Sequence, residues 1–254
     1  MRHFEEPMNT KKLNIENKRI WDANSCIWDE FMGEDGNEWH KELIAPETER
    51  LLNLKKDDRL LDIGCGNGLF ARRMSKKGVK VTAFDFSNSN IENAKRYDST
   101  NIEYLILDAT IDSDLRKLRE TKYEGLLSNM VFMDMPDIEC FFSHVKELLT
   151  DNGVFVFSIQ HPCFNSEYVD IGEESCLTIS DYINTDTSKG VAISTQTKKQ
   201  YYFHRPISYY MNLGIANGLA ITGYVEPTFE SKDKGGVYSK FPPILIIRMI
   251  KLVK

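Results

Sequence analysis

The sequence predicts an α/β domain built on a mostly parallel sheet with helices on both faces. Short apolar segments alternate with segments of helical periodicity from residue 59 to residue 159. The apolar segments are nearly continuous, as expected for strands that helices cover on both sides. The preference for right-handed crossovers then leaves only a few possible strand orders.

Residues 1–45 precede this alternation, and we expect them to form an N-terminal helical segment that acts as a lid. The stretch to about residue 20 is polar, and we expect it to be mobile. Trp21, Trp28 and Phe31 follow at spacings of seven and three, which places them on one face of a helix. These aromatic side chains either anchor the helix or form a platform for a substrate.

The alternation begins with a helix at 46–54, where Pro46 suits the first turn. Strands are expected at 59–63, 79–85, 101–108, 123–132 and 153–159. The helices between them are expected at 68–78, 87–97, 112–120 and 136–149. Gly78 is suited to end the first of these helices, and Ser87 is suited to cap the second.

The alternation breaks at about residues 160–204, which are polar and rich in Ser, Thr and Asp. We interpret this segment as a substrate cap inserted into a single domain that spans 46–254. A helix at 205–218 and two strands at 219–227 and 242–253 complete the domain.

Composition and charge limit the functional classes. The chain of 254 residues carries a net charge of −6 and lacks the basic footprint of a nucleic-acid-binding protein. It has no signal-peptide pattern and no apolar run of the roughly 18 residues that span a bilayer. Its five cysteines form no CxxC pair, so we expect neither a metal site nor disulfides. A cytoplasmic protein without membrane or nucleic-acid partners is expected, and no oligomeric state is predicted.

Three glycines, Gly64, Gly66 and Gly68, lie between the first strand and the helix that follows it. In an open parallel sheet this is the edge where ligands bind, and glycine lets a ligand approach the backbone closely. The unit indicates a nucleotide-like cofactor, although a plain tight turn has the same pattern. A dinucleotide fingerprint would place its third glycine at Leu69, where this sequence has none.

Acidic residues accompany the glycine loop. Asp62 precedes it, Asp85 ends the second strand and Asp108 ends the third. A carboxylate at Asp85 can accept hydrogen bonds from two ribose hydroxyls, and one at Asp108 can accept a hydrogen bond from an adenine amino group. The helix dipole or a capping role could also explain these two acids. Such acids suit a cofactor that carries a sulfonium and an amine better than they suit a pyrophosphate.

These segments resemble the class I S-adenosylmethionine-dependent methyltransferases. The resemblance rests on LLDIGCGNG, VTAFDFS, LDAT and DNGVFVF, in that order from about Pro46 to Gly153. It implies a Rossmann-like, doubly wound, seven-stranded sheet that an antiparallel C-terminal hairpin closes. The segments IQHPCF, YFHRPISYY and VEPTF are similar to a bacterial subgroup of small-molecule methyltransferases that has an HPxF motif after the fifth strand.

The resemblance also implies the residues that bind S-adenosylmethionine and its product S-adenosylhomocysteine. The glycines would approach the methionine and ribose portion, and Asp85 would bind the ribose. Phe86 would pack on the adenine, Asp108 and Ala109 would bracket its edge, and Asn129 and Met130 would lie beside the methyl group. The implied cofactor-binding set is Asp62, Gly64, Cys65, Gly66, Asp85, Phe86, Asp108, Ala109, Asn129 and Met130. Cys65 is also suited to be a small packing residue.

The acceptor side is expected to involve Trp28, Met133, His161, His204 and Arg205. His161 follows the fifth strand directly, and its ordinary pKa suits a general base. A histidine that only holds the inserted segment, and a structural ion pair at Arg205, are the alternatives. His40 is a weaker candidate, and His144 is interpreted as a surface residue.

The sequence therefore predicts an S-adenosylmethionine-dependent methyltransferase that acts on a small-molecule acceptor by in-line methyl transfer. Two alternatives are an NAD-dependent oxidoreductase, which would have the same type of fold, and a non-catalytic protein that binds S-adenosylmethionine. Neither the acceptor nor its reacting atom can be predicted.

Overall fold

The computed structural model describes residues 7–98, 100–172 and 176–252. Residues 1–6, 99, 173–175 and 253–254, which the sequence assigns to the N-terminal segment and to the 46–254 domain, lie outside the described residues.

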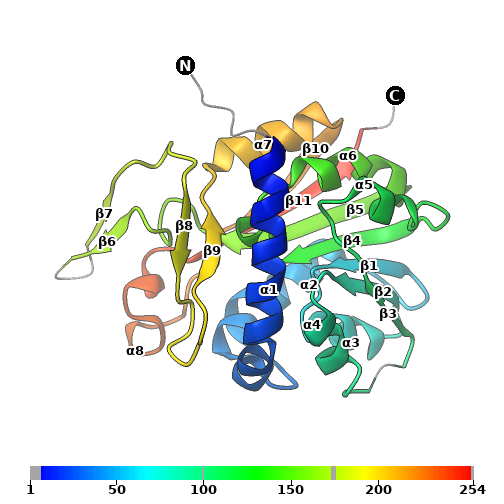
Figure 1. The fold of residues 1–254 in the computed structure, drawn as a ribbon, viewed down its shortest axis with the longest axis horizontal. Coiled ribbons are helices and arrows are strands. Elements are labelled where there is room, and N and C mark those ends of the chain that lie inside the picture. Colours follow the sequence, from blue (N-terminus) through cyan, green and yellow to red (C-terminus); the bar gives the residue numbers. More distant parts are fainter. Residues whose placement is uncertain (1–6, 99, 173–175, 253–254) are drawn as a thin grey trace.

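A seven-stranded sheet forms the centre of the molecule (Figure 1). Its strand order is β3-β2-β1-β4-β5-β11-β10. The first five are parallel, whereas β11 runs antiparallel to both β5 and β10. The strands are β1 (Arg59–Ile63), β2 (Lys80–Asp85), β3 (Ile102–Ile106), β4 (Tyr123–Asn129), β5 (Leu149–Gln160), β10 (Leu219–Val225) and β11 (Ile244–Lys251). The predicted Rossmann-like sheet and its C-terminal hairpin are confirmed.

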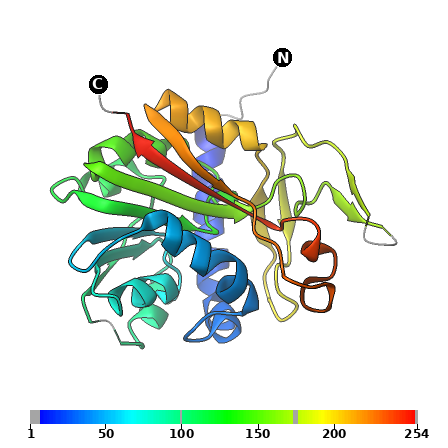
Figure 2. The same ribbon diagram turned by 180° about the vertical axis from the view of Figure 1, so that it is seen from behind.

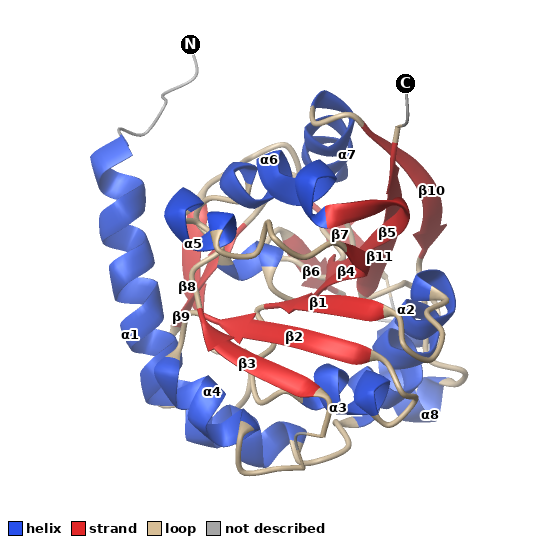
Figure 3. Cartoon of the chain, turned by 90° about the vertical axis from the view of Figure 1, so that its right-hand side faces the viewer, coloured by secondary structure: helices blue, strands red, loops and turns tan. Residues whose placement is uncertain are grey.

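Helices cover both faces of the sheet (Figures 2 and 3). One face carries η1 (His40–Ile44), α2 (Ala45–Leu52), α3 (Leu69–Ser75) and α4 (Asn88–Ala94). The other carries α5 (Asp112–Arg116), α6 (Glu139–Leu148) and α7 (Ile207–Ala216). Side chains alternate between the two cores along each strand, so that Ile244 and Ile246 enter one core and Leu245 and Ile247 enter the other.

Local signals fix several of these boundaries. The Ser87 hydroxyl accepts the Asn90 N–H at 3.1 Å and caps α4, as predicted. Gly78 ends the turn after α3 with a φ of +83°. Strand β5 differs from the expectation, because it begins at Leu149 and not at Gly153. Tyr123 pairs with Leu149, and a register shift between Tyr123 and Gly125 absorbs the extra residues.

The N-terminal helix α1 (Pro7–Met32) begins much earlier than the sequence suggested. The polar stretch to residue 20 was expected to be mobile, but its described part is helical because several polar side chains bond to the sheet's loops. Figure 1 shows α1 running across the front of the sheet, beside α4 and β9.

The inserted segment contains two small antiparallel pairs. They are β6 (Val169–Ile171) with β7 (Leu177–Ile179), and β8 (Thr187–Gly190) with β9 (Gln200–Phe203). Strand β9 reaches back to η2 (Phe132–Asp134), the short helix that follows β4. The short helices α8 (Lys232–Gly235) and η4 (Gly236–Ser239) lie between β10 and β11. Among the described residues, no helix combines the length and apolarity needed to cross a bilayer.

Candidate active site

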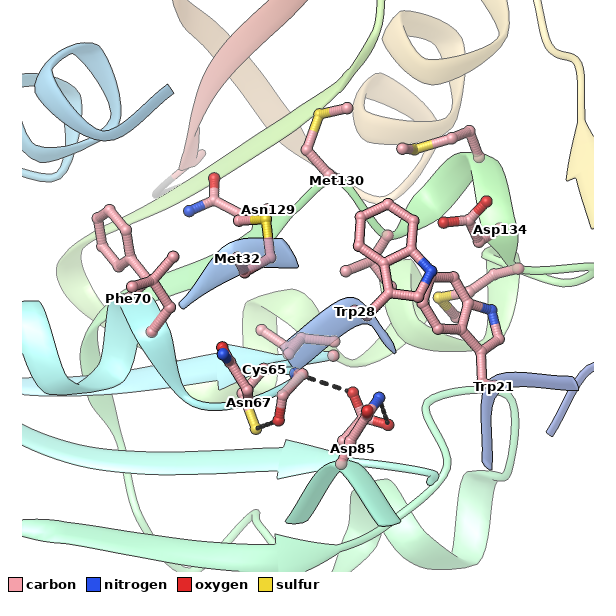
Figure 4. A pocket seen from close by; sticks show the side chains of 18 of the residues that line it. Trp21, Trp28, Met32, Cys65, Asn67, Phe70, Asp85, Asn129, Met130 and Asp134 are labelled. Atoms are coloured by element: carbon pink, nitrogen blue, oxygen red, sulfur yellow. Dashed lines mark hydrogen bonds between the residues drawn. The ribbon is translucent and has the colours of Figure 1, made fainter. Parts of the chain in front are cut away.

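A cavity of about 570 Å³ lies at the carboxyl ends of β1 to β4. The chain turns outward from β1 to β2 and β3 and then returns to β4, so β1 and β4 flank the topological switch point. Helix α1, η1 and strand β9 contribute the opposite walls. Figure 4 shows side chains from α1, from the loop after β1, from the ends of β2 and β4 and from the turn after β4 pointing into one space.

The three loop glycines all have left-handed backbones, with φ of +65° at Gly64, +55° at Gly66 and +74° at Gly68. They differ in their surroundings. A Cβ at Gly64 would lie 2.7 Å from the Val131 side chain, and one at Gly68 would collide with the Tyr104 hydroxyl. A Cβ at Gly66 would meet nothing within 4 Å, and Gly66 lines the cavity. Gly66 is therefore the position where the backbone is open to a ligand.

The Asp85 carboxylate organises this loop (Figure 4). One oxygen accepts the Gly66 N–H at 3.0 Å, and the other accepts the Ser87 N–H at 2.8 Å and an Asn90 amide N–H at 3.4 Å. Burial raises the pKa of Asp85, and these donors oppose that effect. The carboxylate thus holds the glycine loop against the end of β2 while it also lines the cavity.

Several buried polar atoms of residues that line the cavity have no hydrogen-bond partner among the described residues. Two of them are Oδ2 of Asp62 and Nδ2 of Asn129. Burial, followed by the nearby Asp85 charge, raises the pKa of Asp62 to about 8. An unpaired acceptor and an unpaired donor at one end of a cavity are costly unless a ligand completes their hydrogen bonds.

Helix α1 contacts each of the three loops that surround the cavity. Asn14 Nδ2 donates to Asp108 Oδ2 at 2.7 Å, beyond β3. The Ser87 hydroxyl donates to Asp22 at 2.6 Å, beyond β2. The Asn67 amide donates to Asp29 at 2.8 Å, in the glycine loop.

All ten residues of the implied cofactor set line this one cavity, as do Trp28 and Met133. Cys65 is also buried against the core, and burial raises the pKa of its thiol. Met130 has a φ of +56°, an uncommon conformation for a residue with a side chain.

The other three candidates on the acceptor side do not line the cavity. His161 is buried, its Nε2 lies 2.8 Å from Glu226, and its Nδ1 accepts the Cys163 N–H at 3.1 Å. Both ring nitrogens are engaged, so His161 is not placed to take a proton from a molecule in the cavity. The alternative, a histidine that anchors the inserted segment, fits this geometry.

His204 and Arg205 are also buried, and both contact backbone carbonyl oxygens of neighbouring loops. His204 Nε2 lies 2.9 Å from the Tyr182 carbonyl oxygen. Arg205 donates to the carbonyl oxygens of Phe132 at 2.9 Å and Met135 at 2.8 Å. Its guanidinium therefore supports the turn after β4 through backbone oxygens and not through an ion pair.

Sequence reasoning gave little weight to His40 and did not single out Asp134. Both line the cavity and both are buried. Burial lowers the pKa of His40 to about 4, so its ring is neutral, and its Nδ1 has no partner. His40 opens the π-helix η1, a type of helix that is frequent at functional sites. An acid within the apolar run NMVFMDM was the signal available for Asp134.

His144, interpreted from the sequence as a surface residue, is buried. Its Nε2 lies 3.0 Å from Asp112 on the neighbouring helix α5.

Fold and cavity define a Rossmann-like protein with a cofactor-type site at the switch point. A family model described as a methyltransferase domain matches residues 37–183, which is more than half of the chain. The chain therefore belongs to the methyltransferase-domain family.

Individual relatives agree with this family. A ubiquinone biosynthesis O-methyltransferase from Pelagibacter ubique is 30% identical over 123 residues, which are 48% of this chain and 50% of that protein. The chain thus spans about half the length of this curated relative.

Solved structures share the fold. An S-adenosylmethionine-dependent methyltransferase from Mesorhizobium loti is 23% identical with a TM-score of 0.65, covering 85% of this chain and 99% of that one. DhpI, solved as a complex with S-adenosylhomocysteine (SAH), is 16% identical with a TM-score of 0.62, covering 95% of this chain and 98% of that one.

Proposed function

We propose that this protein is an S-adenosylmethionine-dependent methyltransferase that acts on a small-molecule acceptor by in-line methyl transfer. The observation that carries the proposal is the cavity at the switch point, where Asp62, Asp85 and Asp108 surround a glycine loop that is open at Gly66. Family membership and the solved complex of DhpI with SAH support it. We also propose the subgroup with the HPxF motif, on the segments IQHPCF, YFHRPISYY and VEPTF.

The side chains present fit this cofactor. The unpaired Asp62 Oδ2 suits an ammonium group, and the unpaired Asn129 Nδ2 suits a carboxylate or another acceptor. Asp85 would take the ribose hydroxyls while it keeps its backbone donors. Phe86 would pack on the adenine, with Asp108 and Ala109 at its edge. When bound, the cofactor supplies an electrophilic methyl group on its sulfonium.

The protein's own contribution is alignment and exclusion of water. We propose that α1 acts as a lid, because Asn14, Asp22 and Asp29 bond to the three loops around the cofactor site. These bonds must open for exchange of cofactor and product. We propose that the inserted segment 160–204 caps the acceptor side, because Ala192, Ile193 and Gln200 line the same cavity.

The alternatives receive less support. Leu69 opens α3 at the position of the third dinucleotide glycine, and the cavity lining contains no Lys or Arg among the described residues for a pyrophosphate. A non-catalytic binder would need no space beyond the cofactor loops, whereas this cavity continues to Trp21, Trp28 and Met133.

Product formation tests the proposal. The protein is incubated with S-adenosylmethionine and a library of small metabolites, and S-adenosylhomocysteine is quantified by mass spectrometry. We expect acceptor-dependent product with the native protein and none with Asp85→Ala. Binding of S-adenosylmethionine without turnover on any acceptor would favour the non-catalytic alternative.

A further inference from the structure

Part of the cavity lies away from the cofactor loops, and we call it the acceptor chamber. It is formed by Trp21, Trp28, Met133, Asp134 and Gln200. The two indole rings lie 5.7 Å apart with a 36° interplanar angle. They come from α1, whereas Asp134 ends η2 and Gln200 begins β9. Figure 4 shows the Asp134 carboxyl and both indoles at the same end of the cavity.

The turn that carries Asp134 is held firmly. Phe132, two residues earlier, packs against Phe142 and Phe157 with ring centroids 5.5 and 5.3 Å away. Asn17 Nδ2 donates to the Asp134 carbonyl oxygen at 2.7 Å. Asn17 lies one turn before Trp21 on the same face of α1, so this bond also sets Trp21 beside the turn. The carboxyl of Asp134 is thus positioned in the chamber by the core on one side and by α1 on the other.

The Asp134 carboxyl is 7% exposed and has little to compensate for its burial. Gln200 Nε2 donates to Oδ1 at 3.4 Å, a weak neutral contact. Burial raises the pKa of Asp134 well above its usual value. The phenols of Tyr202 and Tyr210 lie near it and are neutral. The Arg205 guanidinium donates to the carbonyl oxygens of Phe132 and Met135 on either side of Asp134 and not to the Asp134 carboxyl.

Charge in the whole cavity has one sign. The described lining contains five aspartates, Asp29, Asp62, Asp85, Asp108 and Asp134, and no Lys or Arg. The first four belong to the cofactor side, where Asp29 and Asp85 bond to the glycine loop, Asp108 bonds to α1 and Asp62 bonds to the backbone of Ala71 in α3. Asp134 is the acid that faces the aromatic chamber. A carboxylate or phosphate acceptor would meet repulsion there, whereas a cation would supply the missing counter-ion.

Resting on the proposed function, we propose that the acceptor is an organic amine that binds as its ammonium ion between the indoles of Trp21 and Trp28 and the carboxylate of Asp134. Indole faces and a buried carboxylate together form the type of site that recognises ammonium groups. Before methylation the nitrogen must lose one proton to free its lone pair. That proton passes to Asp134 Oδ2, so an ammonium–carboxylate pair becomes an amine and a carboxylic acid with no change in total charge.

The test uses the native protein saturated with S-adenosylhomocysteine, whose binding is first measured by calorimetry. A series of alkyl and arylalkyl amines of increasing length, each with its matching alcohol and carboxylate, is then titrated by quenching of tryptophan fluorescence. We expect at least one amine to bind tenfold or more tightly than its alcohol, and no carboxylate to bind better than its alcohol.

Variants assign the preference to Asp134. Asp134→Asn should remove the preference for the amine and leave the alcohol and S-adenosylhomocysteine affinities within about twofold, because Asn keeps the shape of the side chain but cannot carry the negative charge that pairs with an ammonium ion. Asp137→Asn makes the same charge change three residues later, outside the cavity lining, and should keep the preference.

The proposal is overturned if no amine in the series binds more tightly than its alcohol, or if Asp134→Asn retains the preference. Tighter binding of an alcohol would indicate a hydroxyl acceptor. Failure of S-adenosylhomocysteine to bind the native protein would instead count against the proposed function.

Discussion

Gly66 offers a test of why this loop contains glycine. Its φ is +55°, and a Cβ there would meet no protein atom within 4 Å. Gly66→Ala should therefore cost only the left-handed backbone energy of alanine, about 1–2 kcal/mol. For a domain of this size, each kcal/mol corresponds to roughly 2–4 °C in melting temperature. The new methyl group, however, would occupy cavity space where the cofactor approaches the backbone. Overpacking costs about 1–3 kcal/mol, which corresponds to roughly a fivefold to hundredfold loss of affinity.

Gly33 is a matched control for this substitution. Its φ is +63°, its Cβ would also meet nothing within 4 Å, and it does not line the cavity. Urea denaturation should show similar destabilisation for Gly33→Ala and Gly66→Ala, while calorimetry with S-adenosylhomocysteine should show lost affinity for Gly66→Ala alone. Equal affinities for the two variants would refute the reasoning.

Three further predictions concern buried titratable groups. Asp85→Asn should weaken S-adenosylhomocysteine binding by roughly tenfold to hundredfold, because hydrogen bonds to a charged group are worth about 1.5–3 kcal/mol. An unchanged affinity in calorimetry would contradict this. The folded pKa of Asp62 is raised to about 8, so its contribution to stability is present at low pH and is lost as pH rises from about 4 toward 8. In thermal unfolding measured across this pH range, Asp62→Asn should show a smaller loss of stability with rising pH than the native protein. Calorimetry at pH 7 in buffers of different ionisation enthalpy should show that binding of S-adenosylhomocysteine releases a proton from the native protein but not from Asp62→Asn. His161→Ala should lower the free energy of unfolding by about 1–3 kcal/mol through loss of its contact with Glu226, and a large loss of S-adenosylhomocysteine affinity would show that His161 serves the site after all.

Features encoded by short-range patterns could be predicted from the sequence. The strands are short apolar runs, Ser87 caps its helix through a contact three residues away, and the glycine loop follows β1 directly. The positions of the acids at the ends of β1, β2 and β3 bring Asp62, Asp85 and Asp108 to one edge, because parallel strands end on the same side.

Features that depend on long-range contacts could not be predicted. Helix α1 is tied down by Asn14, whose partner Asp108 lies 94 residues away. The two nitrogens of His161 are engaged by Cys163 and by Glu226, and Glu226 lies 65 residues away. A sequence pattern shows that a histidine follows a strand, but it does not show which groups already form hydrogen bonds with the ring nitrogens.

The placement of the acceptor side shows the same limit. Asp134 reaches the chamber because Phe132 is anchored in the core and Asn17 bonds to the turn from α1. His40 reaches the cavity through a π-helix, which no helical periodicity in this short segment indicates.

One measurement tests the central claim most directly: thermal unfolding of the native protein with S-adenosylmethionine, S-adenosylhomocysteine and NAD in parallel. A ligand at 100 times its dissociation constant adds about 2.7 kcal/mol of stability, which is several degrees in melting temperature for a domain of this size. We predict a shift with both S-adenosyl ligands and none with NAD. A shift with NAD alone would contradict the interpretation of the glycine loop and of the acids around it.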